Sequence, residues 1–133
     1  MRNVKFQNEE LKNRKFSFLD LTNADFSNCE LLKSDFSHSN LSHADFTEAN
    51  LEGVNFTKAN LTEAKFNNAV LVKANLDSTI LNGANLSNAS LSDAQFNKTK
   101  IYEAILTNID LAGVDLNEAE GLTEEQKRNI GNF

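Results

Sequence analysis

Proline and tryptophan are absent from this 133-residue chain, and cysteine, methionine and tyrosine occur once each. Proline lacks a backbone N–H and has a fixed φ, so each one would interrupt a continuous ladder of backbone hydrogen bonds. The absence of proline is therefore compatible with an uninterrupted solenoid. A single cysteine cannot form an internal disulfide, which fits a reducing compartment, and we expect a cytoplasmic protein.

Long apolar runs are missing as well. The first residues, MRNVKFQNEELKNRK, contain no stretch suited to a signal peptide, and no later segment is long enough to span a bilayer. We therefore expect no membrane association. The net charge is −6, and this acidic balance disfavours direct binding of nucleic acid, because phosphate contacts need clustered Lys and Arg.

The chain is rich instead in a repeat of five residues. Every fifth position from Phe6 to Leu116 is Phe, Leu or Ile, although only 40% of all residues are hydrophobic. Two positions earlier lies a small residue, most often Ala, and the other three positions are mostly polar. A helix would spread the large residues around its circumference, and a strand would send alternate ones to opposite faces. The period therefore predicts a chain that turns a corner in each unit, with one large and one small residue pointing inward.

The residue before each predicted corner is often Asn or Gly, as at Asn23, Gly53, Asn68 and Gly83. These residue types tolerate the positive φ that the second central residue of a type II turn requires. The sequence thus predicts a turn of this type at the corners.

The units ADF, ANL and AKF resemble those of the pentapeptide-repeat proteins, whose usual unit is A(D/N)LXX, and the resemblance covers residues 4–120. It implies an all-β solenoid, a right-handed quadrilateral β-helix in which four units make one coil. We expect such a β-helix over residues 1–120 and a short α-helical cap or tail over 121–133.

Columns of residues twenty positions apart favour four units per coil over three. With four units, the phenylalanines gather in two facing columns and the leucines in the other two, which suits core packing. About six coils at one strand spacing each would give a rod roughly 28 Å long. The predicted core consists of Phe6, Leu11, Phe16, Leu21, Phe26, Leu31, Phe36, Leu41, Phe46, Leu51, Phe56, Leu61, Phe66, Leu71, Leu76, Leu81, Leu86, Leu91, Phe96, Ile101, Leu106, Leu111 and Leu116.

Both ends of the repeat depart from the pattern. The small inward position is Glu9 and then Arg14, so we expect a first coil that is frayed or caps itself. Thr123 and Gln126 form a capping-box pattern, which favours a short helix over residues 123–130, with a disordered tail as the alternative. The apolar residues expected to cover the last coil are Leu122, Ile130 and Phe133.

Few residues indicate chemistry, and no phosphate loop, HExxH, CxxC or nucleophile elbow occurs. Cys29 occupies a small inward position, which favours a structural thiol. His38 and His43 point outward on adjacent sides, too few ligands for a typical zinc site. Asp25 and Asp45 stack in one outward column, where a solvated face explains them better than acid–base catalysis. We expect no catalytic site, no cofactor and no metal, and so no enzyme.

Charge alternates along the axis: residues 1–19 and 64–100 are net basic, whereas 20–63 and 101–133 are net acidic. Some pentapeptide-repeat proteins resemble duplex DNA and act on DNA gyrase, so DNA mimicry is the alternative function. However, B-DNA has about one charge per 1.7 Å, and a rod of roughly 28 Å would need about 16. This chain has a net charge of −6.

Several apolar residues occupy outward positions. Most of them lie in the second half of the chain, and Leu32 lies nearer the amino end. Isolated exposed apolar residues need no function. Together they also fit a docking patch for a protein partner or for a second copy in a homodimer. We therefore expect a rigid, non-enzymatic surface for protein–protein interaction, with these candidate contact residues: Val70, Val72, Ile80, Tyr102 and Ile105.

Overall fold

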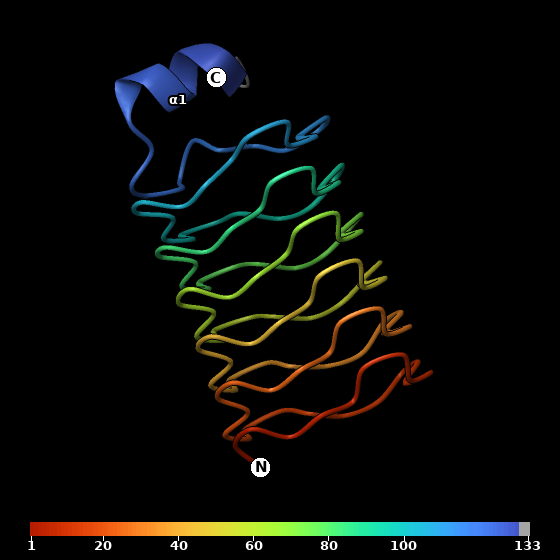
Figure 1. The fold of residues 1–133 in the computed structure, drawn as a ribbon. Coiled ribbons are helices and arrows are strands. Elements are labelled where there is room, and N and C mark those ends of the chain that lie inside the picture. The colour runs from red at the N-terminus through yellow and green to blue at the C-terminus, as the bar shows by residue number, and fades with distance from the viewer. Residues whose placement is uncertain (131–133) are drawn as a thin grey trace.

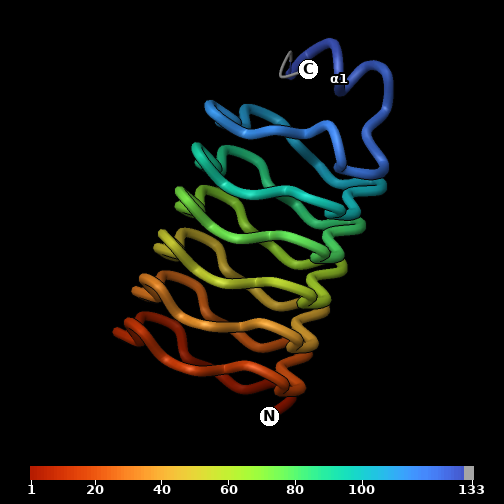
Figure 2. The backbone as a smooth tube through the Cα atoms, turned by 180° about the vertical axis from the view of Figure 1, so that it is seen from behind, coloured from red at the N-terminus to blue at the C-terminus, as the bar shows by residue number. Residues whose placement is uncertain are grey.

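The computed structural model describes residues 1–130 as a stack of four-sided coils followed by one helix, α1 (Glu124–Ile130). The N-terminus lies at one end of the stack and α1 at the other (Figure 1). Viewed from behind, the coils follow one another in a regular stack (Figure 2). Within residues 1–130, no helix is long and apolar enough to cross a bilayer.

Parallel bridges set the register of the stack. They join residues twenty positions apart, from Lys5 with Asp25 to Lys100 with Glu120. This spacing confirms four five-residue units per coil. We name each side of the rod after its first outward residue: the Lys5, Glu10, Lys15 and Asp20 faces follow one another around the coil.

Most units use their backbone groups in the same way. The Phe26 N–H donates to the Asp45 carbonyl of the next coil at 2.7 Å, and the Asp45 N–H donates back to the Ala24 carbonyl at 2.9 Å. At the corner, the Ala24 N–H donates to the Leu21 carbonyl at 3.0 Å. The outward residue of a face thus binds the coil below it with both its N–H and its carbonyl.

An Asp or Asn side chain at the outward position satisfies one more backbone donor. Its Oδ1 accepts the N–H two residues later, as Asp25 does from Ser27 at 2.9 Å and Asn60 from Thr62 at 3.0 Å. In both units the Ser or Thr hydroxyl also donates to the same oxygen. These Asx turns explain why Asp and Asn dominate the outward column, since each replaces a hydrogen bond to water.

Positive φ occurs at the predicted corner position, and it is not confined to Asn and Gly. Phe18, Lys33, His38 and Glu48 all adopt φ between 57° and 61°. This conformation costs roughly 1–2 kcal/mol for a residue with a Cβ. The ladder on both sides of each corner imposes it, so the turn is set by the coil more than by the corner residue.

Every residue of the predicted core is buried except Phe6 and Leu106, which are partly buried near the two ends. The phenylalanine rings stack along each column, as Phe26 does on Phe46 with 5.2 Å between centroids and 4° between planes. Between the two columns the rings meet edge to face, as in Phe36 with Phe46 at 5.6 Å and 85°. Both arrangements are favourable for aromatic pairs.

Buried hydroxyl groups in the small inward column are also satisfied. Each donates to a main-chain carbonyl of the preceding coil: Ser34 to Leu11, and Thr79 to Phe56, both at 2.7 Å. Ser39 and Thr99 bind the carbonyls of earlier coils in the same way. Ser or Thr can therefore replace Ala here without leaving an unpaired buried group.

The first coil differs from the expectation of a frayed end. Glu9 and Arg14 are exposed, yet residues 1–20 bridge residues 21–40 on all four faces. The Arg14 N–H donates to the Ser34 hydroxyl at 3.3 Å, which replaces the usual corner bond. The stacking of the second coil is enough to hold the first one in register.

Phe46 tests the core directly because its ring is fully buried and stacked on both sides. We expect Phe46→Ala to lower the free energy of unfolding by about 3–5 kcal/mol, through lost burial and the cavity left behind. Urea denaturation followed by far-ultraviolet dichroism measures this change. Stability within about 1 kcal/mol of the wild type would show that Phe46 is not a core residue.

Candidate interaction surface

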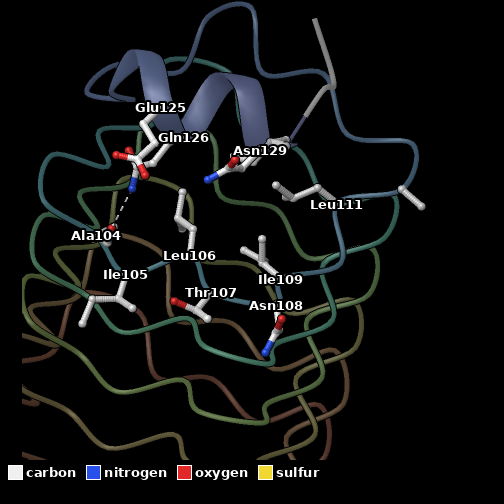
Figure 3. Close-up of a pocket in the computed structure, with 12 residues that line it drawn as sticks. Ala104, Ile105, Leu106, Thr107, Asn108, Ile109, Leu111, Glu125, Gln126 and Asn129 are labelled. Carbon is white, nitrogen blue, oxygen red and sulfur yellow. Dashed lines mark hydrogen bonds between the residues drawn. The ribbon is translucent and has the colours of Figure 1, made fainter.

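A groove lies between α1 and the last complete coil, and we call it the cap groove (Figure 3). It has a volume of about 670 Å³. Leu106 points toward the helix, while Ile105 lies at the edge of the groove and is 47% exposed (Figure 3). The cap groove is also lined by the coil residues Ile109 and Leu111 and by the helix residues Glu125, Gln126, Asn129 and Ile130.

Polar contacts fix α1 above the coil. The Thr123 N–H donates to Oε1 of Gln126 at 3.0 Å, and the Gln126 N–H donates to the Thr123 hydroxyl at 3.1 Å, which confirms the predicted capping box. The Gln126 side-chain amide also donates to the Ala104 carbonyl at 3.0 Å (Figure 3). Leu122 and Ile130 pack against the core. Phe133, also expected to cover the last coil, lies outside the described residues.

The five predicted contact residues do not meet in one patch. Val70 belongs to the Glu10 face and Ile80 to the opposite Asp20 face. Val72 lies at the corner after Val70 and is half-buried. Tyr102 and Ile105 lie at and just beyond the corner between the Asp20 and Lys5 faces, and they are the more exposed neighbouring pair, at 51% and 47%. Of the predicted contact residues, Tyr102 and Ile105 at the carboxyl-terminal end are therefore the candidates for a docking patch.

Phe18 was not among the predicted surface residues, although it is the most exposed large apolar residue within residues 1–130, at 74%. Its ring stacks on His38, with 4.5 Å between centroids and 6° between planes. A phenylalanine at a corner position, where Asn and Gly are typical, was the available sequence signal. Stacking on His38 covers one side of the ring and gives the residue a structural explanation.

The two histidines do not converge on a common ligand. His38 stacks on Phe18, whereas Nε2 of His43 lies 3.3 Å from the Glu63 carboxylate. Among residues 1–130, no group of three or more His, Cys, Asp and Glu side chains is arranged to hold a metal ion. These described residues therefore form no set of side-chain ligands for a cation.

The acids of the band 20–63 are spread around the rod. Asp25 and Asp45 lie on the Lys5 face, Glu30 on the Glu10 face, Asp35 on the Lys15 face and Asp20 on the Asp20 face. All four aspartates cap a backbone N–H two residues later, a role that Asn fills in other coils. At Asp20 the hydrogen bonds from Thr22, helped by the nearby Arg2, lower the pKa of the carboxyl. The capping of turns therefore accounts for the four outward aspartates of this band.

Cys29 is buried, and its thiol donates to the Phe6 carbonyl at 2.8 Å. Burial raises the pKa of this thiol because the thiolate would lose its solvation. Since the thiolate is the reactive form, Cys29 is an inert structural residue in the folded protein.

We expect native Cys29 to react with a disulfide reagent at about pH 8 at least about 100-fold more slowly than the urea-unfolded chain. Absorbance of the released thiolate measures both rates. Equal rates in the two states would contradict the buried environment of the thiol.

Gly121 joins the last coil to α1 at a φ of 109°. A Cβ here would lie 2.6 Å from the backbone nitrogen and 2.8 Å from the Cα of Tyr102. We expect Gly121→Ala to displace α1 and to lower the free energy of unfolding by roughly 1–3 kcal/mol. Faster hydrogen exchange at the α1 amides would show the displacement.

Gly53→Ala is the matched control for Gly121→Ala. Its φ is also positive, but its Cβ would meet only the flexible Lys33 side chain, at 3.2 Å. We expect this variant to leave exchange in α1 unchanged. If Gly121→Ala did the same, the close approach of Gly121 to Tyr102 would not be what positions the helix.

Several solved structures are similar to this chain. A pentapeptide repeat protein from the Arabidopsis thaliana thylakoid lumen is 27% identical with a TM-score of 0.50, covering 86% of this chain and 75% of its own. HetL from Nostoc, described as involved in heterocyst differentiation regulation, is 24% identical over 90% of this chain and 87% of its own, with a TM-score of 0.44. QnrB1, a plasmid-mediated fluoroquinolone resistance protein, is 18% identical over 98% of this chain and 95% of its own, with a TM-score of 0.37.

Family profiles match most of the coil stack, whereas no curated protein matches the chain. The profile described as pentapeptide repeat region matches residues 1–76, and that described as pentapeptide repeats (8 copies) matches residues 69–108. The five-residue period, the twenty-residue bridges and these matches agree, and the chain belongs to the pentapeptide-repeat family.

Proposed function

We propose that the protein is a non-enzymatic scaffold whose cap groove binds an apolar segment of a partner protein. The observation that carries this proposal is the 47% exposure of Ile105 at the edge of a groove of about 670 Å³. Tyr102, 51% exposed, extends the apolar surface around the adjacent corner. A groove lined by both apolar and polar side chains, with exposed apolar residues at its edge, is suited to docking a protein segment.

The charge around the cap groove favours a basic partner. Glu125 lines the groove, and residues 101–133 are net acidic. A segment with one apolar side chain flanked by Lys or Arg would fill the groove and meet this charge. The rigid coil would hold the contact residues in place before binding, which lowers the entropy cost of association.

Structural roles for the other reactive side chains support a non-enzymatic reading. The aspartates of the Lys5 face cap turns, and Cys29 is buried within the stack. DNA mimicry acting on DNA gyrase has less support, because the acids of the band 20–63 lie on all four faces. We also propose a cytoplasmic setting, on the basis of the single unpaired thiol.

Ile105→Glu tests the cap groove. It places a charge at the apolar edge, and we expect it to weaken partner binding by about tenfold or more while leaving the fold intact. The proteins captured on the wild-type and variant chains are compared quantitatively. The affinity of any protein that is lost only from Ile105→Glu is then measured by calorimetry. Ile80→Glu, on a different face, is the control and should keep the partner.

Two results would contradict this assignment of the groove. In one, the captured proteins bind Ile105→Glu and the wild type equally well. In the other, Ile105→Glu and Ile80→Glu lose the same proteins to the same extent, which would indicate binding elsewhere on the rod. Matching far-ultraviolet spectra of the three chains establish that each comparison concerns folded protein.

A further inference from the structure

The amino-terminal end of the stack presents a regular set of unpaired backbone groups. In the coils above, each outward residue from Asp25 to Asp110 exchanges hydrogen bonds with the coil below, as Asp45 does with Ala24 and Phe26. In the first coil, the N–H and carbonyl groups of four exposed residues have no such partner within residues 1–130. These residues are Lys5, Glu10, Lys15 and Asp20.

The same four residues form a ring of alternating charge, one on each face in the order basic, acidic, basic, acidic. The apolar residues Val4, Phe6 and Leu19 are only partly buried near this end. At the opposite end of the stack, α1 lies over the last coil (Figure 1). Open β-edges of this kind are templates for pairing with another chain.

We propose that this end is an interface between two copies of the chain, joined end to end by a two-fold axis perpendicular to the rod. Such an axis reverses the direction in which the chain winds, so the two first coils run antiparallel where they meet. In an antiparallel hydrogen-bonded pair, two opposite residues exchange both of their N–H···O bonds. The free groups of the four ring residues have the orientation that this pairing needs, since each residue's N–H and carbonyl point the same way.

Charge selects the direction of the two-fold axis. An axis through the middle of a face pairs like with like: two ring residues of one sign meet their own copies, and the two of the other sign meet each other. An axis through a corner pairs every lysine with an acid, because the signs alternate around the square. Like charges opposite each other destabilise a strand pair and opposite charges stabilise it, so a corner axis is favoured.

The rise of the coil selects one corner. Because each coil climbs steadily over its twenty residues, the edge is a spiral with a step between its start and its end. Two such edges remain parallel along their whole length only when the axis passes through the corner at Lys12 and Asn13. Lys5 then meets Asp20 of the second copy, and Glu10 meets Lys15 of the second copy.

This arrangement also accounts for the two charged residues that break the inward pattern. Glu9 and Arg14 lie on either side of the Lys12 corner and are both exposed. Across the proposed axis, Glu9 becomes a diagonal neighbour of Arg14 in the second copy, on the inward side of the same strand pair. The charges that look like defects in an isolated chain are complementary in the pair.

The end of one coil is small compared with the about 800 Å² per partner that stable complexes bury, so we expect a dissociation constant in the micromolar range. Sedimentation equilibrium of the whole chain from about 1 µM to about 1 mM should show a monomer–dimer equilibrium. Raising the salt from roughly 50 mM to roughly 500 mM should weaken the dimer, because it screens the ring charges.

Lys15→Glu should weaken the dimer by about tenfold or more, because it places two Glu–Glu contacts beside the axis. The swap Glu10→Lys with Lys15→Glu should restore the affinity to within about threefold, since each opposite pair is kept with its signs exchanged. Lys65→Glu makes the same change of net charge in mid-rod and should have no effect.

A wild-type chain that is monomeric throughout would overturn the proposal. So would equal effects of Lys15→Glu and Lys65→Glu, or a dimer lost in Ile105→Glu, which would place the contact at the cap groove. Failure of the charge swap to restore the dimer would overturn the proposed axis. Thermal melting of each variant confirms that the coils are intact.

Discussion

The pairing of each residue with the one twenty positions later is the constraint on which this structure depends. One register serves both the backbone ladder and the stacked core, as Asp25 bridges Asp45 while the Phe26 ring stacks on Phe46. A shift of one unit would exchange phenylalanine and leucine columns and break the ring stacks. The register is therefore held by hydrogen bonding and side-chain packing together. The ladder alone could form after a shift of one unit, but the side-chain columns would then no longer match.

The same register explains much of the polar surface. Outward Asp and Asn side chains cap the corner that follows, and corner residues as unlike as Phe18 and Glu48 adopt the positive φ of the coil. Both Asp and Asn occur in these columns because both supply the required oxygen. The charge of these outward columns alone is thus a poor guide to partners. Departures from the repeat, at Ile105, Glu9 and Arg14, are more informative about binding.

Much of the fold could be predicted from the sequence because a period of five has few structural solutions. The coil, its columns and the cap initiated by Thr123 all follow from local residue types. The interaction surface could not be predicted as well, because outward side chains are constrained only where they cap a turn. Val70 and Ile80, ten residues apart, lie on opposite faces as the twenty-residue coil predicts, whereas the cap groove depends on how Gln126 anchors α1 to Ala104. The stacking of Phe18 on His38 likewise depends on the coil, which brings residues twenty positions apart into contact.

The twenty-residue coil is tested most directly by a distance along the rod. Asn8 and Asn108 share one corner column, five coils apart. Spin labels at Asn8→Cys and Asn108→Cys, in a chain with Cys29→Ala, should give a narrow electron–electron distance distribution centred near about 24 Å, before correction for the label arms. A broad distribution, or a centre that stayed beyond about 40 Å after that correction, would contradict the stacked square coil.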